Sequence, residues 1–193
     1  MCTELHLLRP RQQKGISLVE LIMFIVIVSL AIVGILSVMN VTTKASADPM
    51  LRKQALAVAE SLLEEIQLQA FTYCSPDDAN ATTAVSAAAC ANAANSEDNL
   101  PGSARVSNAP NIARVANNVA DYHKLNLPVI YDVNGTDVGV TGFSAKVLIT
   151  QVGTTLTITN TDVLQIDVTV TDPGANTYTL TGYRFRYAPR AVP

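Results

Sequence analysis

The stretch that decides the fold is KGISLVELIMFIVIVSLAIVG, residues 14–34, an apolar run with a single carboxylate near its start. No charged residue occurs from Leu21 to Met39. As a helix, those nineteen residues would rise about 28 Å, close to the hydrocarbon thickness of a bilayer. The basic residues Arg9, Arg11 and Lys14 all precede the run, so we expect a cytoplasmic N-terminus and an exported remainder.

Two ordinary interpretations of this run do not use the carboxylate. The first is a plain signal anchor. The second is a secretory signal peptide, in which ASA at residues 45–47 fits a small-x-small cleavage site and releases a soluble periplasmic binding protein that begins at Asp48. Against the second, the apolar run is longer than the usual core of a signal peptide, and Glu20 is a poor residue inside such a core.

A third interpretation gives Glu20 a function. A buried acidic side chain in a membrane helix costs about 2.5–3.5 kcal/mol and therefore needs a partner. Cleavage after Gly15 would create one, the α-amine of Ile16. Opposite charges about 4 Å apart attract by about 4 kcal/mol at an effective dielectric of 20, which offsets that cost. If the amine belongs to a neighbouring chain shifted along the helix axis, Glu20 sets the register of assembly.

The segment RQQKG followed by ISLVEL, residues 11–21, resembles the processing region of type IV prepilins. The resemblance implies that residues 1–15 are a leader removed by prepilin peptidase after Gly15. It also implies that Ile16 becomes the N-methylated first residue and that Glu20 is the carboxylate that guides subunit docking. The family usually starts its mature chain with phenylalanine, so Ile16 departs from the pattern while remaining apolar.

Two further stretches, residues 48–81 and GYRFRYAP at 182–189, resemble the D-type minor pilins of the mannose-sensitive haemagglutinin (MSHA) pilus system, a group within this family. The resemblance implies a type IV pilin fold and a minor pilin that is incorporated into a filament or initiates it. It implies other pilin subunits, prepilin peptidase and the inner membrane as partners, with final placement on the pilus at the cell surface. A minor pseudopilin of a type II secretion system remains the alternative within the same class.

Residues 48–70 carry one apolar stripe at three- and four-residue steps, formed by Leu51, Ala55, Val58, Leu62 and Ile66. This spacing predicts an amphipathic helix that lies on a globular partner. Asp48 and Pro49 suit a helix start, so we expect residues 16–47 and 48–70 to form one long helix with a bend or melted patch within 34–49.

The charges of residues 48–70 oppose the helix dipole. Arg52 and Lys53 lie at the start, and Glu60, Glu64 and Glu65 lie toward the end. Solvation explains this arrangement simply. The alternative hypothesis is that the basic end of one subunit meets the acidic end of an axially staggered neighbour.

An alanine-rich stretch follows the helix. Nine of the eighteen residues from Ala79 to Ser96 are alanine, without an apolar stripe. Cys74 and Cys90 are the only cysteines after the leader, and an even pair in an exported domain predicts a disulfide. We therefore expect a surface loop, residues 74–90, clamped at its base.

The last third of the chain predicts a sheet from about residue 140 to 188, rich in Val, Ile, Thr and Tyr with alternating polarity. The clearest inward face is Leu164, Ile166, Val168 and Val170, and DPGAN at 172–176 predicts a hairpin turn. Gly182 suggests a bulge, because the apolar face shifts there from Tyr178 and Leu180 to Tyr183, Phe185 and Tyr187. A short helix is possible over 112–122. We therefore expect residues 71–193 to form a globular head whose antiparallel sheet packs on the apolar stripe of the helix, an α+β fold.

We find no pattern of an enzyme, a cofactor or a metal site. His123 has no nucleophile that can be paired with it from sequence, and DVNGTD at 132–137 predicts a turn rather than a calcium loop. The net charge of −3 does not favour nucleic acid as a partner. Arg184, Arg186 and Arg190 suggest the polar face of a strand.

Overall fold

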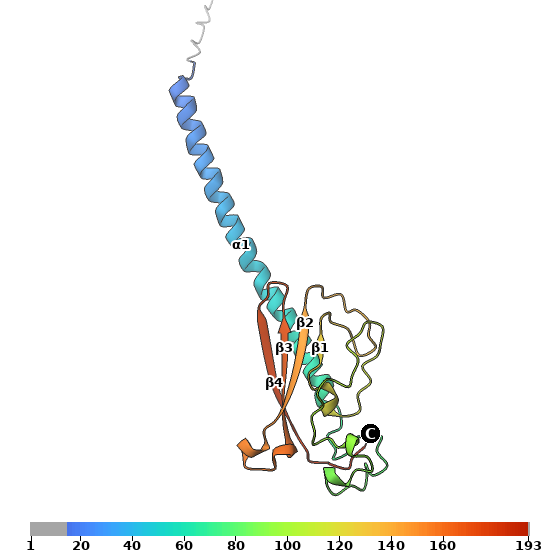
Figure 1. Cartoon of the computed structure of the whole chain (residues 1–193). Helices are drawn as coiled ribbons and strands as arrows, with labels where there is room; N and C mark the ends of the chain where they lie inside the picture. The colour runs from blue at the N-terminus through green and yellow to red at the C-terminus, as the bar shows by residue number, and fades with distance from the viewer. Residues whose placement is uncertain (1–14, 193) are drawn as a thin grey trace, which may run out of the picture. The chain divides into compact units, whose positions relative to one another are not determined.

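The computed structural model describes residues 15–192, with residues 41–48 described by their backbone only. The chain consists of two units, Met1–Ala47 and Asp48–Pro193. One helix, α1 (Leu18–Gln67), contributes to both, and a four-stranded sheet belongs to the second unit (Figure 1). The protein is therefore α+β, as expected.

The α1 helix is continuous across residues 34–49, so the predicted melted patch is absent from the described backbone. Asp48 is also not the start of a helix, because α1 begins thirty residues earlier, at Leu18. Pro49 lies inside the helix, where its missing N–H removes one backbone hydrogen bond. The helix ends at Gln67, three residues before the predicted end at residue 70.

The apolar stripe of residues 48–67 forms one wall of the core. Ala55, Leu62 and Ile66 are buried, as the spacing predicted, and Ala59 and Leu63 join them. Leu51 and Val58 are half-buried against the same cluster. This half of α1 therefore contributes one face to the head and leaves the opposite face in solvent.

The sheet consists of β1 (Asn126–Leu127), β2 (Ser144–Gln151), β3 (Val163–Thr171) and β4 (Thr177–Phe185), in that order and entirely antiparallel. Burial alternates along β2 and β3, which gives an inner and an outer face. The predicted inward face is confirmed. All four of its members are fully buried: Leu164, Ile166, Val168 and Val170. The two-residue β1 was not predicted.

The predicted hairpin between β3 and β4 is confirmed, with Thr171 opposite Thr177. The Asp172 N–H donates to Asn176 O at 2.9 Å, and the Asp172 carboxylate accepts the Asn176 N–H at 2.8 Å. These hydrogen bonds to Asn176, together with those to Gly174 and Tyr178, keep the pKa of Asp172 below its ordinary value.

The prediction of a bulge at Gly182 is wrong. The pairing of β3 with β4 runs without interruption, and Ile166 lies opposite Gly182. Gly182 is buried because α1 passes directly over it. A Cβ atom at residue 182 would lie 2.9 Å from Leu63 Cδ1 and 2.5 Å from Gln67 Nε2. The apolar residues Tyr183 and Phe185 remain on the outer face, about half exposed.

The predicted helix over 112–122 is also wrong. Only one 3₁₀ turn forms there, η3 (Val119–Tyr122), and Ile112 and Val115 are 54 % and 82 % exposed. The helical spacing of Ile112, Val115, Val119 and Tyr122 was coincidental, because only Val119 and Tyr122 are buried. Two other short turns, η1 (Ala87–Ala89) and η2 (Ala93–Asn95), lie in the alanine-rich stretch. The last two, η4 (Gly153–Leu156) and η5 (Asn160–Asp162), connect β2 to β3.

We predict that Gly182→Ala lowers the free energy of unfolding by about 1–3 kcal/mol, because the new methyl group overpacks the helix-to-sheet contact. Gly102→Ala is the matched control, since no atom lies within 4 Å of a Cβ built there. The midpoint of chemical denaturation of the two variants measures the difference. Equal midpoints would show that α1 does not press on β4 at this residue.

Candidate functional site

The segment that carries the predicted processing site lies just ahead of α1. Gly15, Ile16 and Ser17 are exposed and not helical, and the Leu21 N–H donates to Ser17 O at 3.1 Å. Nothing lies within 4 Å of a Cβ built on Gly15. The predicted cleavage point between Gly15 and Ile16 is therefore sterically open on its described side. The rest of the predicted leader lies outside the described residues.

Glu20 lies in the first turn of α1 and its side chain is exposed. A carboxylate there is favourable toward the positive end of the helix dipole, by about 0.3–1 kcal/mol at a hydrated site. No ion pair within residues 15–192 involves Glu20. Its charge is thus not compensated by another side chain within the described part of the chain.

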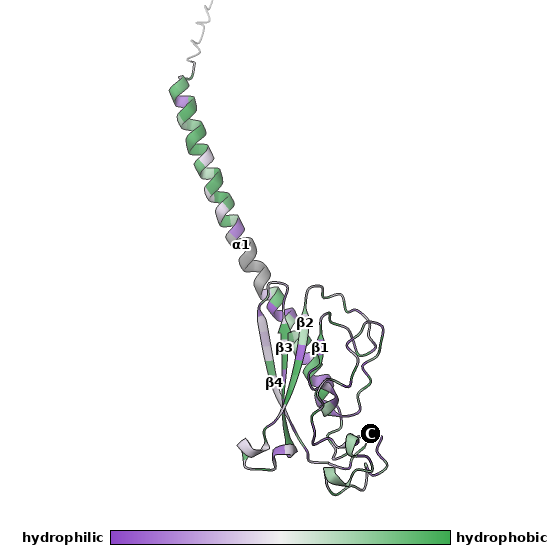
Figure 2. Cartoon of the chain, in the orientation of Figure 1, coloured by the Kyte–Doolittle hydropathy of each residue, from purple (hydrophilic) through white to green (hydrophobic). Residues whose placement is uncertain are grey.

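The helix that follows is apolar on all sides. Leu18–Asn40 is long and apolar enough to cross a membrane, as its hydropathy colouring shows (Figure 2), and none of its residues is buried within the chain. Ser29 donates its hydroxyl to Ile25 O at 2.7 Å, so this polar group is satisfied inside the helix. The length and composition are those of a membrane anchor and of an N-terminal signal sequence alike.

The charged residues on the head half of α1 divide into two groups. Arg52, Lys53, Glu60 and Glu64 are exposed, as solvated charges would be. Glu65 is different, because Arg114 binds it through two hydrogen bonds, Nε to Oε1 at 3.0 Å and Nη2 to Oε2 at 2.8 Å. The hypothesis that Glu65 belongs to an acidic end offered to a neighbouring subunit is therefore wrong for this residue.

Glu65 of α1 forms hydrogen bonds with residues of the segment 71–143. Besides Arg114, Tyr122 donates its hydroxyl to Glu65 Oε1 at 2.8 Å. Arg114 also donates from Nη1 to Tyr131 O at 2.8 Å. Burial and the nearby Glu65 carboxylate both raise the pKa of Tyr122, so the phenol stays a donor. Glu65, Arg114 and Tyr131 line a largely apolar hollow of about 430 Å³ beside α1.

A second buried cluster contains two carboxylates and one arginine. Arg105 Nη1 donates to both oxygens of Glu97 at 3.3 Å and to Asp121 Oδ1 at 3.1 Å. Glu97 is completely buried, and its desolvation raises the pKa of the carboxyl to about 7 despite the attraction of Arg105. Asp121 adds to the rise by repulsion, and Arg186 opposes it.

The arginines near the C-terminus do not form the solvated strand face that the sequence suggested. The side chain of Arg186 is 1 % exposed, with its guanidinium 4.3 Å from the Phe71 ring centre and 5.1 Å from that of Tyr73. Its Nη1 lies 2.7 Å from Asp98 Oδ1. Arg184 and Arg190 donate to backbone carbonyls, of Gln69 and Ala84 respectively. These arginines hold chain segments together.

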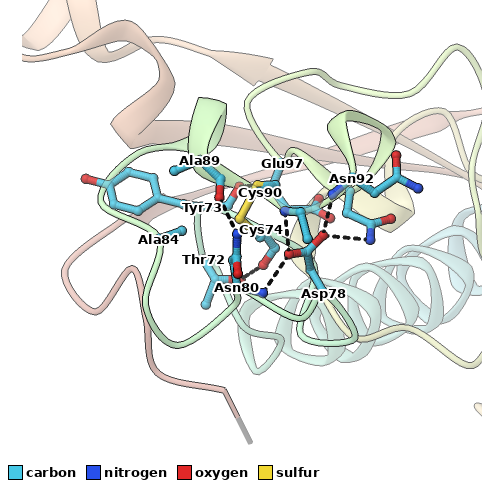
Figure 3. Close-up of a disulfide and its surroundings, with 12 residues drawn as sticks. Thr72, Tyr73, Cys74, Asp78, Asn80, Ala84, Ala89, Cys90, Asn92 and Glu97 are labelled. Carbon is cyan, nitrogen blue, oxygen red and sulfur yellow. Dashed lines mark hydrogen bonds between the residues drawn. A yellow bond between two sulfur atoms is a disulfide. The ribbon is translucent and has the colours of Figure 1, made fainter.

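The predicted disulfide between Cys74 and Cys90 is present, with sulfurs 2.09 Å apart (Figure 3). Inside the loop it closes, Asp78 organises the backbone. Its carboxylate accepts the N–H groups of Asn80, Ala91 and Asn92 at 2.9–3.1 Å. These bonds lower the pKa of Asp78 to about 2. Sequence analysis missed this role, although an Asx turn at Asp78 is locally readable.

The remaining candidates have structural roles. His123 is buried and its Nδ1 accepts the Ile149 N–H at 3.3 Å, and burial lowers the pKa of the imidazole. Asp132 accepts the N–H groups of Asn134 and Thr136, and Gly135 adopts a φ of 81°. The segment 132–137 is therefore the turn that Asn-Gly predicted. Among the described residues, no group of three or more His, Cys, Asp or Glu side chains is arranged to hold a metal ion.

The buried Glu97 generates a prediction about pH. Because its pKa is higher in the folded than in the unfolded chain, its contribution to stability is full below pH 4.5 and is lost as pH rises through about 7. The lost stability amounts to roughly 3 kcal/mol at most.

His123 changes the stability with pH in the opposite direction, so the protein must be compared with Glu97→Gln, which removes only the titration of this carboxyl group. The difference in unfolding free energy between the two proteins, measured by chemical denaturation, is expected to grow in favour of the variant from pH 5 to pH 8. A constant difference would contradict the assigned titration.

Comparison with models of protein families, with curated proteins and with solved structures found no match to this chain.

Proposed function

We propose that this chain is a minor pilin of a type IV pilus of the MSHA kind, processed by prepilin peptidase and built into the filament or its initiating complex. The observation that carries the proposal is the spacing of Gly15, Ile16 and Glu20 at the start of the apolar run, whose helical part is Leu18–Asn40. A glycine, a new apolar N-terminus and a carboxylate fifth from it form a pattern that neither a plain anchor nor a signal peptide requires.

The chemistry of the proposal is charge compensation in a medium of low dielectric. Cleavage after Gly15 leaves a cationic amine on Ile16, and Glu20 is an anion in the first turn of α1. Both residues are exposed, which is what contact with a neighbouring subunit requires. A subunit placed correctly beside another therefore relieves the cost of a charge in lipid, and one placed wrongly does not.

The other parts of the molecule are compatible with this role. The disulfide fits a head that is exported to an oxidising compartment. A single apolar helix near the N-terminus, preceded by basic residues, fits a single-pass inner-membrane precursor with a cytoplasmic N-terminus and a periplasmic head. Assembly would then move the head to the pilus and the cell surface. The proposal assigns no enzymatic activity and no cofactor.

One observation favours a second candidate. The compact head unit begins at Asp48, the residue that a signal-peptide cut after Ala47 would leave first. A released periplasmic binding protein would therefore keep the whole head. A type II secretion minor pseudopilin, in contrast, would share every feature of the proposed pilin, and the genes beside this one are what separates pilus from secretion system.

We predict that the mature protein begins with N-methylated Ile16. Mass spectrometry of the N-terminal peptide of protein purified from membranes is the measurement. A mature chain that starts at Asp48 would replace the pilin proposal with that of the released protein. A chain that keeps residues 1–15 would leave only the plain anchor.

We predict that Glu20→Ala inserts into the membrane and is cleaved, yet enters filaments at least about tenfold less than the unchanged protein. The loss of a charge pair worth about 4 kcal/mol at a dielectric of 20 is the reason. Glu60→Ala is the matched control, because Glu60 is an exposed glutamate of the same helix outside the apolar segment. The ratio of filament to membrane protein on immunoblots is the measurement, and undiminished incorporation of Glu20→Ala would contradict the docking role.

A further inference from the structure

The strand β4 is an open edge of the sheet. It pairs with β3 on one side, and the strand order ends with it (Figure 1). The opposite edge is β1, which contains only Asn126 and Leu127. The nine residues of β4 therefore offer by far the longer free edge.

The register identifies the backbone groups that point outward. The Asp172 N–H donates to Asn176 O, and the Arg186 N–H donates to Asp162 O, each at 2.9 Å. In an antiparallel pair such bonds fall on alternate residues, so the even-numbered residues of β4 face β3. The odd-numbered residues Thr177, Thr179, Thr181 and Tyr183 then turn their N–H and C=O groups away from the sheet. Among the described residues, no hydrogen bond to these four N–H groups is present.

The edge lacks the features by which proteins normally prevent strand addition. Such edges are short, bulged, charged or interrupted by proline. Here β4 contains no proline, its pairing with β3 has no bulge, and none of the odd-numbered side chains is charged. Tyr183 and Phe185 instead add two half-exposed aromatic rings to the outer face, 49 % and 47 % exposed.

We propose that β4 is the docking edge for an extended strand of a different polypeptide, which adds to the sheet as an antiparallel fifth strand. Its backbone would satisfy the outward groups of Thr177 to Tyr183. The incoming strand has no charge opposite this edge, and it places an aliphatic or β-branched side chain against Tyr183 and Phe185.

We favour a different polypeptide over a second copy of this chain at this edge. Every strand pair in the sheet is antiparallel, and antiparallel pairing is the more stable kind. An antiparallel pair of two β4 strands would also reverse residues 48–67 of one copy relative to the other, because this part of α1 belongs to the same unit as β4. The first residues of the two heads would then lie at opposite ends of the pair, whereas two N-termini anchored in one membrane favour both on the same side. This step rests on the anchoring in the proposed function.

The test uses the full chain in its own cells, with the photocrosslinker benzoylphenylalanine in place of Tyr183 or, separately, Thr177. We expect one adduct with a different polypeptide, in which the two probes attach to the same segment in the reverse order of the chain. Thr179→Pro, introduced with the Tyr183 probe, should lower the yield of this adduct at least about tenfold because it removes an outward N–H. Thr179→Val is the matched control, since it also removes the hydroxyl but keeps the N–H.

A second pair of variants keeps the test independent of the folding of the proline variant. With the probe at Thr177, Tyr183→Lys places a charge on the edge, and Leu148→Lys places the same charge on the outer face of the inner strand β2, where Leu148 is 50 % exposed. Only the first should lower the yield. Adducts between two copies, attachment in the same chain order, or yields insensitive to both Thr179→Pro and Tyr183→Lys would overturn the proposal.

The outcome is separable from that of the proposed function. A methylated Ile16 without edge adducts would remove only the inference about β4. Edge adducts on a chain that begins at Asp48 would remove the pilin proposal and the argument against a second copy, and they would leave the docking edge itself in place.

Discussion

The close approach of α1 to the inner face of the sheet is the constraint on which the head depends. Gly182 permits it on the sheet side, because a Cβ there would meet Leu63 and Gln67. On the helix side Ala55 and Ala59 are completely buried, and such small residues let a helix lie near its partner. The larger Leu62 and Ile66 then fill the space against the valines and isoleucines of β2 and β3. Side-chain size, as much as hydrophobicity, sets this contact.

Charged side chains perform the second task, which is to hold the long segment 71–143. That segment has few regular hydrogen bonds of its own, so its backbone polar groups need other partners. Asp78 supplies them within the disulfide loop, and Arg114 links Glu65 of the helix to Tyr131 O. Buried pairs of this kind select one arrangement of the chain, because separating them leaves an uncompensated charge in the interior.

The two contacts proposed for this protein use two different kinds of exposed surface. The apolar half of α1 carries apolar side chains on its whole circumference, and no residue of Leu18–Asn40 is buried. The edge of β4 exposes backbone donors and acceptors in a regular row. The first surface can be covered by lipid or by other apolar helices, and this hydrophobic contact is non-directional. The second surface pairs only with another extended strand in a particular register, so that contact provides specificity.

The sequence by itself determined the features that depend on neighbours close along the chain. The length of the apolar run determined the apolar helix, and the three- and four-residue spacing determined its buried stripe. Alternation of apolar and polar residues determined the strands β2 and β3, and the sequence DPGAN determined the hairpin. The pairing of Cys74 with Cys90 could also be predicted, because they are the only two cysteines after residue 15.

Tertiary structure alone decided the features whose partners lie far apart in sequence. Glu65 meets Arg114 across forty-nine residues, and Arg186 reaches Phe71 and Tyr73 across more than a hundred. For the same reason the sequence wrongly predicted a bulge at Gly182, because the residues around it do not reveal that α1 packs over it. Periodicity shows which side of a strand is apolar, but only the packed fold determines which charge is buried beside which aromatic ring. That difference follows from range, because local sequence encodes local geometry and burial is a property of the whole chain.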